Sequence, residues 1–196
     1  MPRRSKADAE KTRERLIAVA THLFQKHGYA DTSINQICAE LGITKGALFH
    51  HFGSKEGLFL AVWTRLQTDM DAEARTAAIA ARSLTDPYAS LLAGCRTYLK
   101  YAVRADYQTV VLIDGPAVLG HQGWYEKDFD LGAQNMNAGM RYLAKKGIID
   151  EARVRAFAVM LQSALNGAGF ALARREPGVT VDGIYDAFEA MVKGLR

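Results

Sequence analysis

The chain has 196 residues, of which 49% are hydrophobic and 23% charged, a length and composition that suit a globular protein of one large or two small domains. No apolar run approaches the roughly 18 residues that a membrane-spanning helix needs, so we expect no membrane partner. The charged start of the chain, residues 1–16, lacks the apolar segment of a secretory signal, which favours a cytoplasmic protein.

The positive charge of the chain is concentrated only slightly in its first part. Residues 1–60 hold nine Lys/Arg and six Asp/Glu, a net charge of +3, while the whole chain has a net charge of +4. An excess of this size agrees with nucleic-acid binding, but charge alone does not establish it.

A basic tail and a first helix begin the chain. Arg3, Arg4 and Lys6 lie in a segment that is either a solvated terminus or a basic arm on DNA, and the two interpretations are compatible. A helix over about residues 9–26 has an apolar stripe at helical spacing, and Gly28 is predicted to end it. We expect this helix to support the next two helices rather than to read DNA.

The next stretch predicts two short helices joined by a tight turn. Ser33, followed three residues later by Gln36, forms a capping box that begins the first helix, and Gly42 suits the left-handed residue after its end. Thr44 is a good N-cap for a second helix over residues 45–51. Two short helices joined by a turn of about three or four residues that contains a glycine describe a helix-turn-helix.

The outward-facing side chains of the second helix favour DNA as its partner. Leu48 and Phe52 are four residues apart and point inward. A hydroxyl, an ammonium, a position without a side chain, an aromatic ring and an imidazole are left outside: Thr44, Lys45, Gly46, Phe49 and His50. The first residues of a recognition helix reach base edges, and small residues let the backbone approach the groove. The alternative is an ordinary helical hairpin with a solvated lysine, which a two-helix pattern alone would favour.

The remainder of the chain is predicted to be helical as well. Ser54 is expected to cap a long helix over residues 55–81, where Lys55 opposes the helix dipole and so favours a phosphate contact. Later helices are expected over residues 87–103, 106–119, 124–146 and 151–174, and from Thr180 or Asp182 to about 195, with a stop at Gly115-Pro116 and a loop at 120–123. No strand pattern appears, so the predicted fold class is all-α.

The helix-turn-helix stretch resembles the DNA-binding domain of the TetR family of transcriptional repressors, over about the first sixty residues. The resemblance is carried by TSI at 32–34, ICAELGI at 37–43, TKGALFHHF at 44–52 and SKE at 54–56. One departure is Phe49, where the family usually has a tyrosine that donates its hydroxyl to a phosphate. Phe49 cannot make that contact, and it is left to pack against a sugar or a thymine methyl group.

The resemblance implies an all-α protein with a DNA-binding domain at residues 1–54 and a ligand-binding and dimerisation domain at residues 55–196. It implies a homodimeric repressor that binds a pseudo-palindromic double-stranded DNA operator and is released by a small-molecule effector. The residues expected at the DNA are Thr32, Ser33, Thr44, Lys45, Gly46, Phe49, His50 and Lys55. Of these, Lys45 and His50 are expected near the bases, and the three hydroxyl residues and Lys55 at phosphates.

An effector pocket of largely apolar character is expected in the second domain, where its helices should converge. Its predicted lining combines aromatic, apolar and a few polar residues: Tyr98, Val110, Ile113, Asp114, Trp124, Tyr125, Phe129, Asn166 and Phe170. Aromatic residues at helical spacing also occur in plain core, so we expect only part of this set to line a cavity. Asp114 and Asn166 stand out because a buried polar group needs a partner, which an effector would supply.

The last two predicted helices carry more apolar surface than one chain needs for its own core. Small residues such as Ala164 and Gly167 permit close contact between helices. We infer a two-fold interface of four helices, two from each chain, and the alternative is a core helix of a monomer.

Two other classes of protein compete with this interpretation. For an enzyme, the nearest constellation is His121 with Asp114 and Asp128, whose loose spacing favours a solvated loop, and no metal or cofactor motif appears. A DNA architectural protein that does not switch leaves the long second part unexplained. Cys38 and Cys95 are interpreted as small buried residues in a reducing compartment, with a disulfide between them as the less favoured alternative.

Overall fold

The computed structural model describes the backbone of residues 6–195, and all their side chains except those of His121, Tyr125 and residues 128–133. Throughout this part of the chain the elements are helices without a strand, which confirms the predicted all-α class. In chain order they are α1 (Lys6–Asp31), α2 (Ile34–Leu41), α3 (Lys45–Phe52), α4 (Lys55–Ala80), α5 (Ala89–Ala102), α6 (Ala105–Tyr107), the π-helix η1 (Gln108–Asp114), α7 (Gly115–Leu119), α8 (His121–Lys145), the 3₁₀ turn η2 (Glu151–Arg153), α9 (Val154–Ala173) and α10 (Val181–Lys193).

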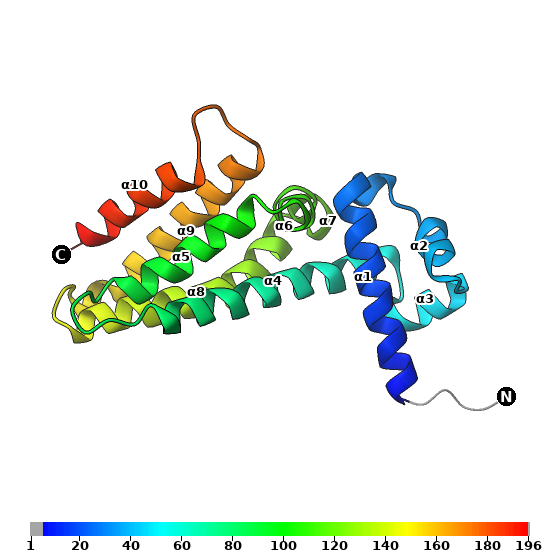
Figure 1. Ribbon diagram of the computed structural model, residues 1–196, viewed down its shortest axis with the longest axis horizontal. Coiled ribbons are helices and arrows are strands. Elements are labelled where there is room, and N and C mark those ends of the chain that lie inside the picture. Colours follow the sequence, from blue (N-terminus) through cyan, green and yellow to red (C-terminus); the bar gives the residue numbers. More distant parts are fainter. Residues whose placement is uncertain (1–5, 196) are drawn as a thin grey trace.

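The helices α1, α2 and α3 form a compact head at one end of the molecule (Figure 1). Their boundaries follow from the predicted caps, because Ser33 Oγ accepts the Gln36 N–H at 3.2 Å while Gln36 Oε1 accepts the Ser33 N–H at 2.7 Å. Gly42 adopts the left-handed conformation after α2, and Thr44 caps α3. The predicted helix-turn-helix is therefore confirmed as a local structure. Its core is fully buried and consists of Leu16, Phe24, Ile37, Leu48, Leu58 and Phe59.

The helix α4 joins the head to the second bundle. It has 26 residues and is therefore roughly 39 Å long. Its first turns bury Leu58, Phe59 and Val62 in the head, and its second half runs beside α5 in the other bundle (Figure 1). One helix thus contributes to two hydrophobic cores, so that a movement of either core is carried to the other.

Three predicted boundaries were wrong. The helix α5 begins at Ala89 rather than at 87, because Asp86 Oδ1 accepts the Tyr88 N–H at 2.9 Å and forms a turn ahead of it. Pro116 does not end the helical stretch, because it lies in the first turn of α7, where a missing N–H costs little. Gly120, with φ of 72°, ends α7 instead, and α8 follows at once without the predicted loop.

The seven-residue π-helix η1 was not predicted from the sequence. It continues α6 and leads directly into α7, and its buried face holds Val110, Val111 and Leu112. The indole of Trp124 donates to the Val111 carbonyl at 2.9 Å, which fixes the start of α8 against η1. Segments of π-helix are rare and often occur at functional sites, so η1 is of interest in relation to the head, against which it packs.

The helix α9 is the most apolar helix of the second bundle. Residues 151–173 are long and apolar enough to cross a membrane by length and composition, which corrects the expectation that no such stretch exists. In this structure α9 packs against α5 and α8, and its buried polar residues Gln162 and Asn166 hydrogen-bond to each other at 3.0 Å. A helix that buries a polar pair against neighbouring helices behaves as a core helix of a bundle.

Gly115 allows two tryptophan rings to meet the backbone where η1 becomes α7. A Cβ atom at Gly115 would lie 2.9 Å from Cδ1 of Trp124 and 3.1 Å from Nε1 of Trp63, and both rings are almost completely buried. We predict that Gly115→Ala lowers the free energy of unfolding by about 1–3 kcal/mol, because overpacked cores must shift. Chemical denaturation measures this, with Gly123→Ala as the matched control, since a Cβ there meets nothing within 4 Å. Equal or greater stability of Gly115→Ala would contradict the packing described.

Candidate functional site

The first residues of α3 form an exposed surface at the end of the head. Thr44, Lys45, Gly46 and His50 are exposed, and Phe49 is 44% exposed although its side chain is large and apolar. Thr44 Oγ1 accepts the Ala47 N–H at 3.3 Å, so the hydroxyl that caps the helix also lies at its open end. We call these five residues the α3 surface.

The α3 surface is held in place from behind by the core of the head. Leu48 lies on the opposite side of the same helix and is completely buried. At the end of the helix, the guanidinium of Arg13 lies over the ring of Phe52, 5.6 Å from its centroid. An exposed aromatic ring beside a lysine and a glycine is unfavourable in water and suits a surface that docks into a groove. Ser33, at the start of α2, is also exposed.

Two residues predicted at the DNA instead face the protein. Thr32 is 1% exposed, and its hydroxyl donates to the carbonyls of Gly28 at 2.7 Å and Leu23 at 3.2 Å. Lys55 is half-buried; its Nζ lies 4.2 Å from the ring centroid of Tyr29 and donates to a carbonyl at the end of α1. Both side chains therefore tie the end of α1 to the elements around it, and their predicted phosphate contacts stay predictions.

A cavity of about 730 Å³ lies in the second bundle between α4, α5, α8 and α9. Its wall is mostly apolar, and three of the polar side chains that line it, from three helices, are buried: Gln67, Tyr98 and Gln162. Small residues from three helices, Ala74, Gly94 and Gly139, are part of its lining. A Cβ atom at Gly139 would lie 2.7 Å from Cδ1 of Leu91, so this glycine allows α8 to pack closely against α5. The cavity has the size and character of a small-molecule site.

The charges around the cavity balance. Two aspartates and two arginines line it, and Asp71 accepts hydrogen bonds from both Arg75 and Asn135. Cys95 in the wall is free and buried, and burial raises the pKa of its thiol to about 12, so it behaves as a small apolar residue as predicted. A cavity whose charges balance in number and whose wall is mostly apolar suits a neutral molecule better than an ion.

The predicted pocket residues and the cavity coincide at Tyr98 alone among the described side chains. Val110, Trp124 and Phe170 belong to solid packing beside η1, where Trp124 and Phe170 stack with ring centroids 5.0 Å apart. Asn166 borders the site indirectly through Gln162, and Ile113 is 50% exposed. The side chains of the two remaining members, Tyr125 and Phe129, lie outside the described residues, as do those of His121 and Asp128 from the enzyme alternative.

Asp114 has a partner that the sequence did not indicate. Its Oδ2 accepts the backbone N–H of Tyr29, from the end of α1, at 2.7 Å. Burial raises the pKa of the Asp114 carboxyl above its ordinary value, while the Tyr29 N–H and the positive charge of Lys55 act in the opposite direction. This carboxylate is therefore a contact between the second bundle and the head.

An exposed recognition-type helix on a three-helix head, joined to a helical bundle with a cavity, defines a helix-turn-helix regulator of the two-domain type. Residues 16–62 match the family described as bacterial regulatory proteins, tetR family, and residues 88–195 match the tetracyclin repressor-like C-terminal domain. The chain belongs to the TetR family of transcriptional regulators.

Individual relatives agree with this assignment. A solved TetR-family transcriptional regulator from Pectobacterium atrosepticum is 33% identical, covers 98% of this chain and 97% of its own, and superimposes with a TM-score of 0.83. The regulator AcrR of Shigella flexneri is 38% identical over 63 residues, and a probable acrEF/envCD operon repressor of Escherichia coli K12 is 41% identical over 63 residues. These two matches cover 32% of this chain and only 29% of each relative, so they concern one part of both proteins.

Proposed function

We propose that the protein is a homodimeric, cytoplasmic transcriptional repressor that binds a pseudo-palindromic operator and leaves it when a small molecule enters the cavity. The observation that carries the proposal is the α3 surface, whose exposed aromatic, cationic and small residues are backed by a rigid core. The similarity of the first part of the chain to an operon repressor supports repression as the mode of action. The cavity supports a switching regulator rather than an architectural DNA-binding protein.

At the DNA, each chain places α3 in a major groove. Lys45 and His50 lie near the bases, Gly46 lets the backbone approach, and Phe49 packs against a sugar or a thymine methyl group. The exposed hydroxyls of Ser33 and Thr44 lie at phosphates, which fixes the position of the head without specifying sequence. Thr32 and Lys55 support this surface from behind through the contacts at the end of α1.

We predict that Lys45→Ala weakens operator binding by about 1–3 kcal/mol and relaxes the preference at one base position in each half-site, because a cation that reads a base is lost. The measurement is fluorescence anisotropy with a duplex selected from a random library, at fixed salt. Lys100→Ala is the matched control, since it removes the same exposed charge from α5. If both variants bind and discriminate like the unchanged protein, Lys45 does not read a base.

The dimer is supported by two stripes of small and apolar residues that one chain leaves exposed. On α9 the stripe holds Ala156, Met160, Ala164 and Gly167, and Met160 is 66% exposed. On α10 a similar stripe includes Met191, which is 43% exposed. Two such helices from each chain form a self-complementary four-helix interface about a two-fold axis, as a pseudo-palindromic operator requires.

We predict that Met160→Asp raises the dissociation constant of the dimer by at least about 100-fold, because the two-fold axis places an unpaired carboxylate in the interface twice. Sedimentation velocity over a range of concentrations measures it. Val103→Asp, which adds a carboxylate at another exposed apolar position, serves as control and should leave the dimer intact. A dimer equally stable in both variants would place the interface elsewhere.

The effector is a neutral and largely apolar molecule. The balanced charges and mostly apolar wall of the cavity support this class, and the buried polar residues in its lining supply hydrogen bonds that orient the molecule. Its binding favours a dimer geometry in which the two copies of α3 no longer match the groove spacing. A coupling of about 1–3 kcal/mol between the two sites is typical for such a switch.

We predict that the neutral apolar dye Nile red binds the cavity, and that Ala74→Phe weakens its binding on the order of tenfold or more, because the ring fills the space beside α5. Dye fluorescence in a titration of the full-length protein measures the affinity. Ala72→Phe adds the same ring to an exposed position of α4 outside the cavity wall and should have no effect. Equal loss in both variants would show that the dye binds elsewhere.

A further inference from the structure

The end of α1 is an unusual joint, because the helix breaks at Gly28, shortly before the helix-turn-helix begins. Gly28 has φ of 76° and ψ of 170°, which takes the following N–H out of the helical hydrogen-bond ladder. That N–H, from Tyr29, is half-buried and needs an acceptor. Asp114 provides it from 85 residues further along the chain, at 2.7 Å.

The joint is held from two sides. Lys55, in the first turn of α4, places its Nζ over the Tyr29 ring and donates to the Ala30 carbonyl at 3.3 Å. Tyr29 also packs its ring edge-to-face on Phe59, with centroids 5.0 Å apart. The contacts from Lys55 and Phe59 belong to α4, whereas the contact from Asp114 comes from the second bundle. The helix α2 starts only a few residues later, so the position of this joint sets the position of the helix-turn-helix.

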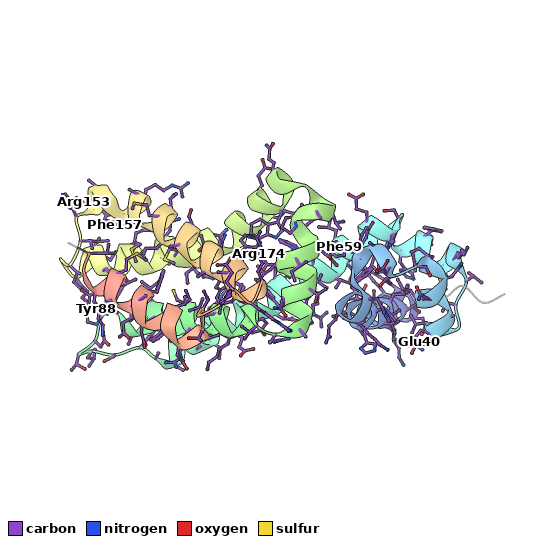
Figure 2. All side chains as sticks on the ribbon, turned by 90° about the horizontal axis from the view of Figure 1, so that it is seen from above. Glu40, Phe59, Tyr88, Arg153, Phe157 and Arg174 are labelled. Carbon is purple, nitrogen blue, oxygen red and sulfur yellow. The ribbon has the colours of Figure 1, made fainter. Side chains whose placement is uncertain are left out.

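Asp114 belongs to η1, and the other end of η1 lies next to the cavity wall. Asp114 is the last residue of η1, and the residue that precedes η1, Tyr107, donates its hydroxyl to Oε1 of Gln67 in the cavity wall. Gln108, the first residue of η1, donates to the Ala173 carbonyl at the end of α9 at 2.7 Å. The π-helix therefore runs from the wall of the cavity to the end of α1. Figure 2 shows this region between the two bundles, close to the labelled Phe59.

A π-helix is a suitable element for a change of register. Converting it to α-helix alters the number of residues per turn, which moves the residues at its far end around and along the axis. Asp114 is at that far end, and such a movement would take its carboxylate out of hydrogen-bond distance of the Tyr29 N–H, which it now accepts at 2.7 Å. A molecule in the cavity that competes for Gln67 acts directly on the near end.

We infer that Asp114 is the positioning residue through which the cavity controls the head. Its carboxylate accepts the Tyr29 N–H while Tyr107, just before η1, is hydrogen-bonded to Gln67, and the bond to Tyr29 breaks when the bond to Gln67 is lost. This inference rests on the proposed function and names the regulation of the same cavity. It assigns Asp114 to the protein's own joint rather than to an effector.

The test is amide hydrogen exchange at Tyr29, followed by NMR on the full-length dimer without DNA or ligand. Asp114→Ala removes the acceptor and should speed exchange at Tyr29 by about tenfold or more, while amides within α1 and α4 keep their protection. Asp114→Asn keeps an acceptor oxygen and should exchange close to the rate of the unchanged protein. Tyr107→Phe cuts the anchor at the cavity end and should also speed exchange at Tyr29.

The double variant Asp114→Ala/Tyr107→Phe should exchange no faster at Tyr29 than Asp114→Ala, because both changes act on one hydrogen bond. Slow exchange in Asp114→Ala would overturn the inference, as would Tyr107→Phe with exchange at Tyr29 unchanged. Operator affinity is measured separately, and we expect it to fall in Asp114→Ala and to be retained in Asp114→Asn. Failure of the unchanged protein to bind any duplex would refute the proposed function and leave the exchange result to decide the role of Asp114.

Discussion

The structure depends on a single helix, α4, that packs in both parts of the molecule. The first turns of α4 complete the core of the head with Leu58 and Phe59, and its later turns form a wall of the cavity with Gln67 and Ala74. Because packed cores resist continuous deformation, neither end can shift without a rearrangement of the other. Because both bundles share this helix, a movement of one is transmitted to the other. The hydrogen bond between Asp114 and the Tyr29 N–H is a second connection between them.

The division of the molecule follows from where large and small side chains are placed. In the head, large apolar residues fill the space between the three helices, which gives the α3 surface a rigid support. In the second bundle, alanine and glycine residues of α4, α5 and α8 line the cavity. The proposed function needs an exposed surface on a firm support and a domain with a cavity, and the two bundles differ in this way because their side chains differ in size.

The sequence predicted best those features that depend on neighbours in the chain. The caps at Ser33, Thr44, Ser54 and Thr180 all form as expected, because a hydroxyl and the N–H three residues later are brought together by the helix itself. The exposed positions of α3 were also predictable from the inward pair on the same helix. The burial of Thr32 was not predictable, because its hydroxyl donates to carbonyls of α1 and the pattern around it does not reveal these partners.

The cavity and the joint depended on contacts between distant parts of the chain. The second half of α4 is rich in alanine, and Ala74 and Ala78 line the cavity only because α5 and α8 lie opposite them in the fold. Trp124 and Phe170 suggested a pocket, yet their rings pack against each other and do not line the cavity. The π-helix has no sequence signal of its own, and the partner of Asp114 is a backbone group that no side-chain pattern marks.

The central claim is that two copies of the α3 surface, held by one dimer, enter duplex DNA. The most direct measurement is a selection from a random duplex library by the purified protein, followed by the stoichiometry of the complex in an analytical ultracentrifuge. The account predicts enrichment of a two-fold symmetric motif whose half-sites lie on one face of the duplex, with chains bound in multiples of two. A monomeric protein that enriches no sequence and binds no duplex at low salt would contradict it.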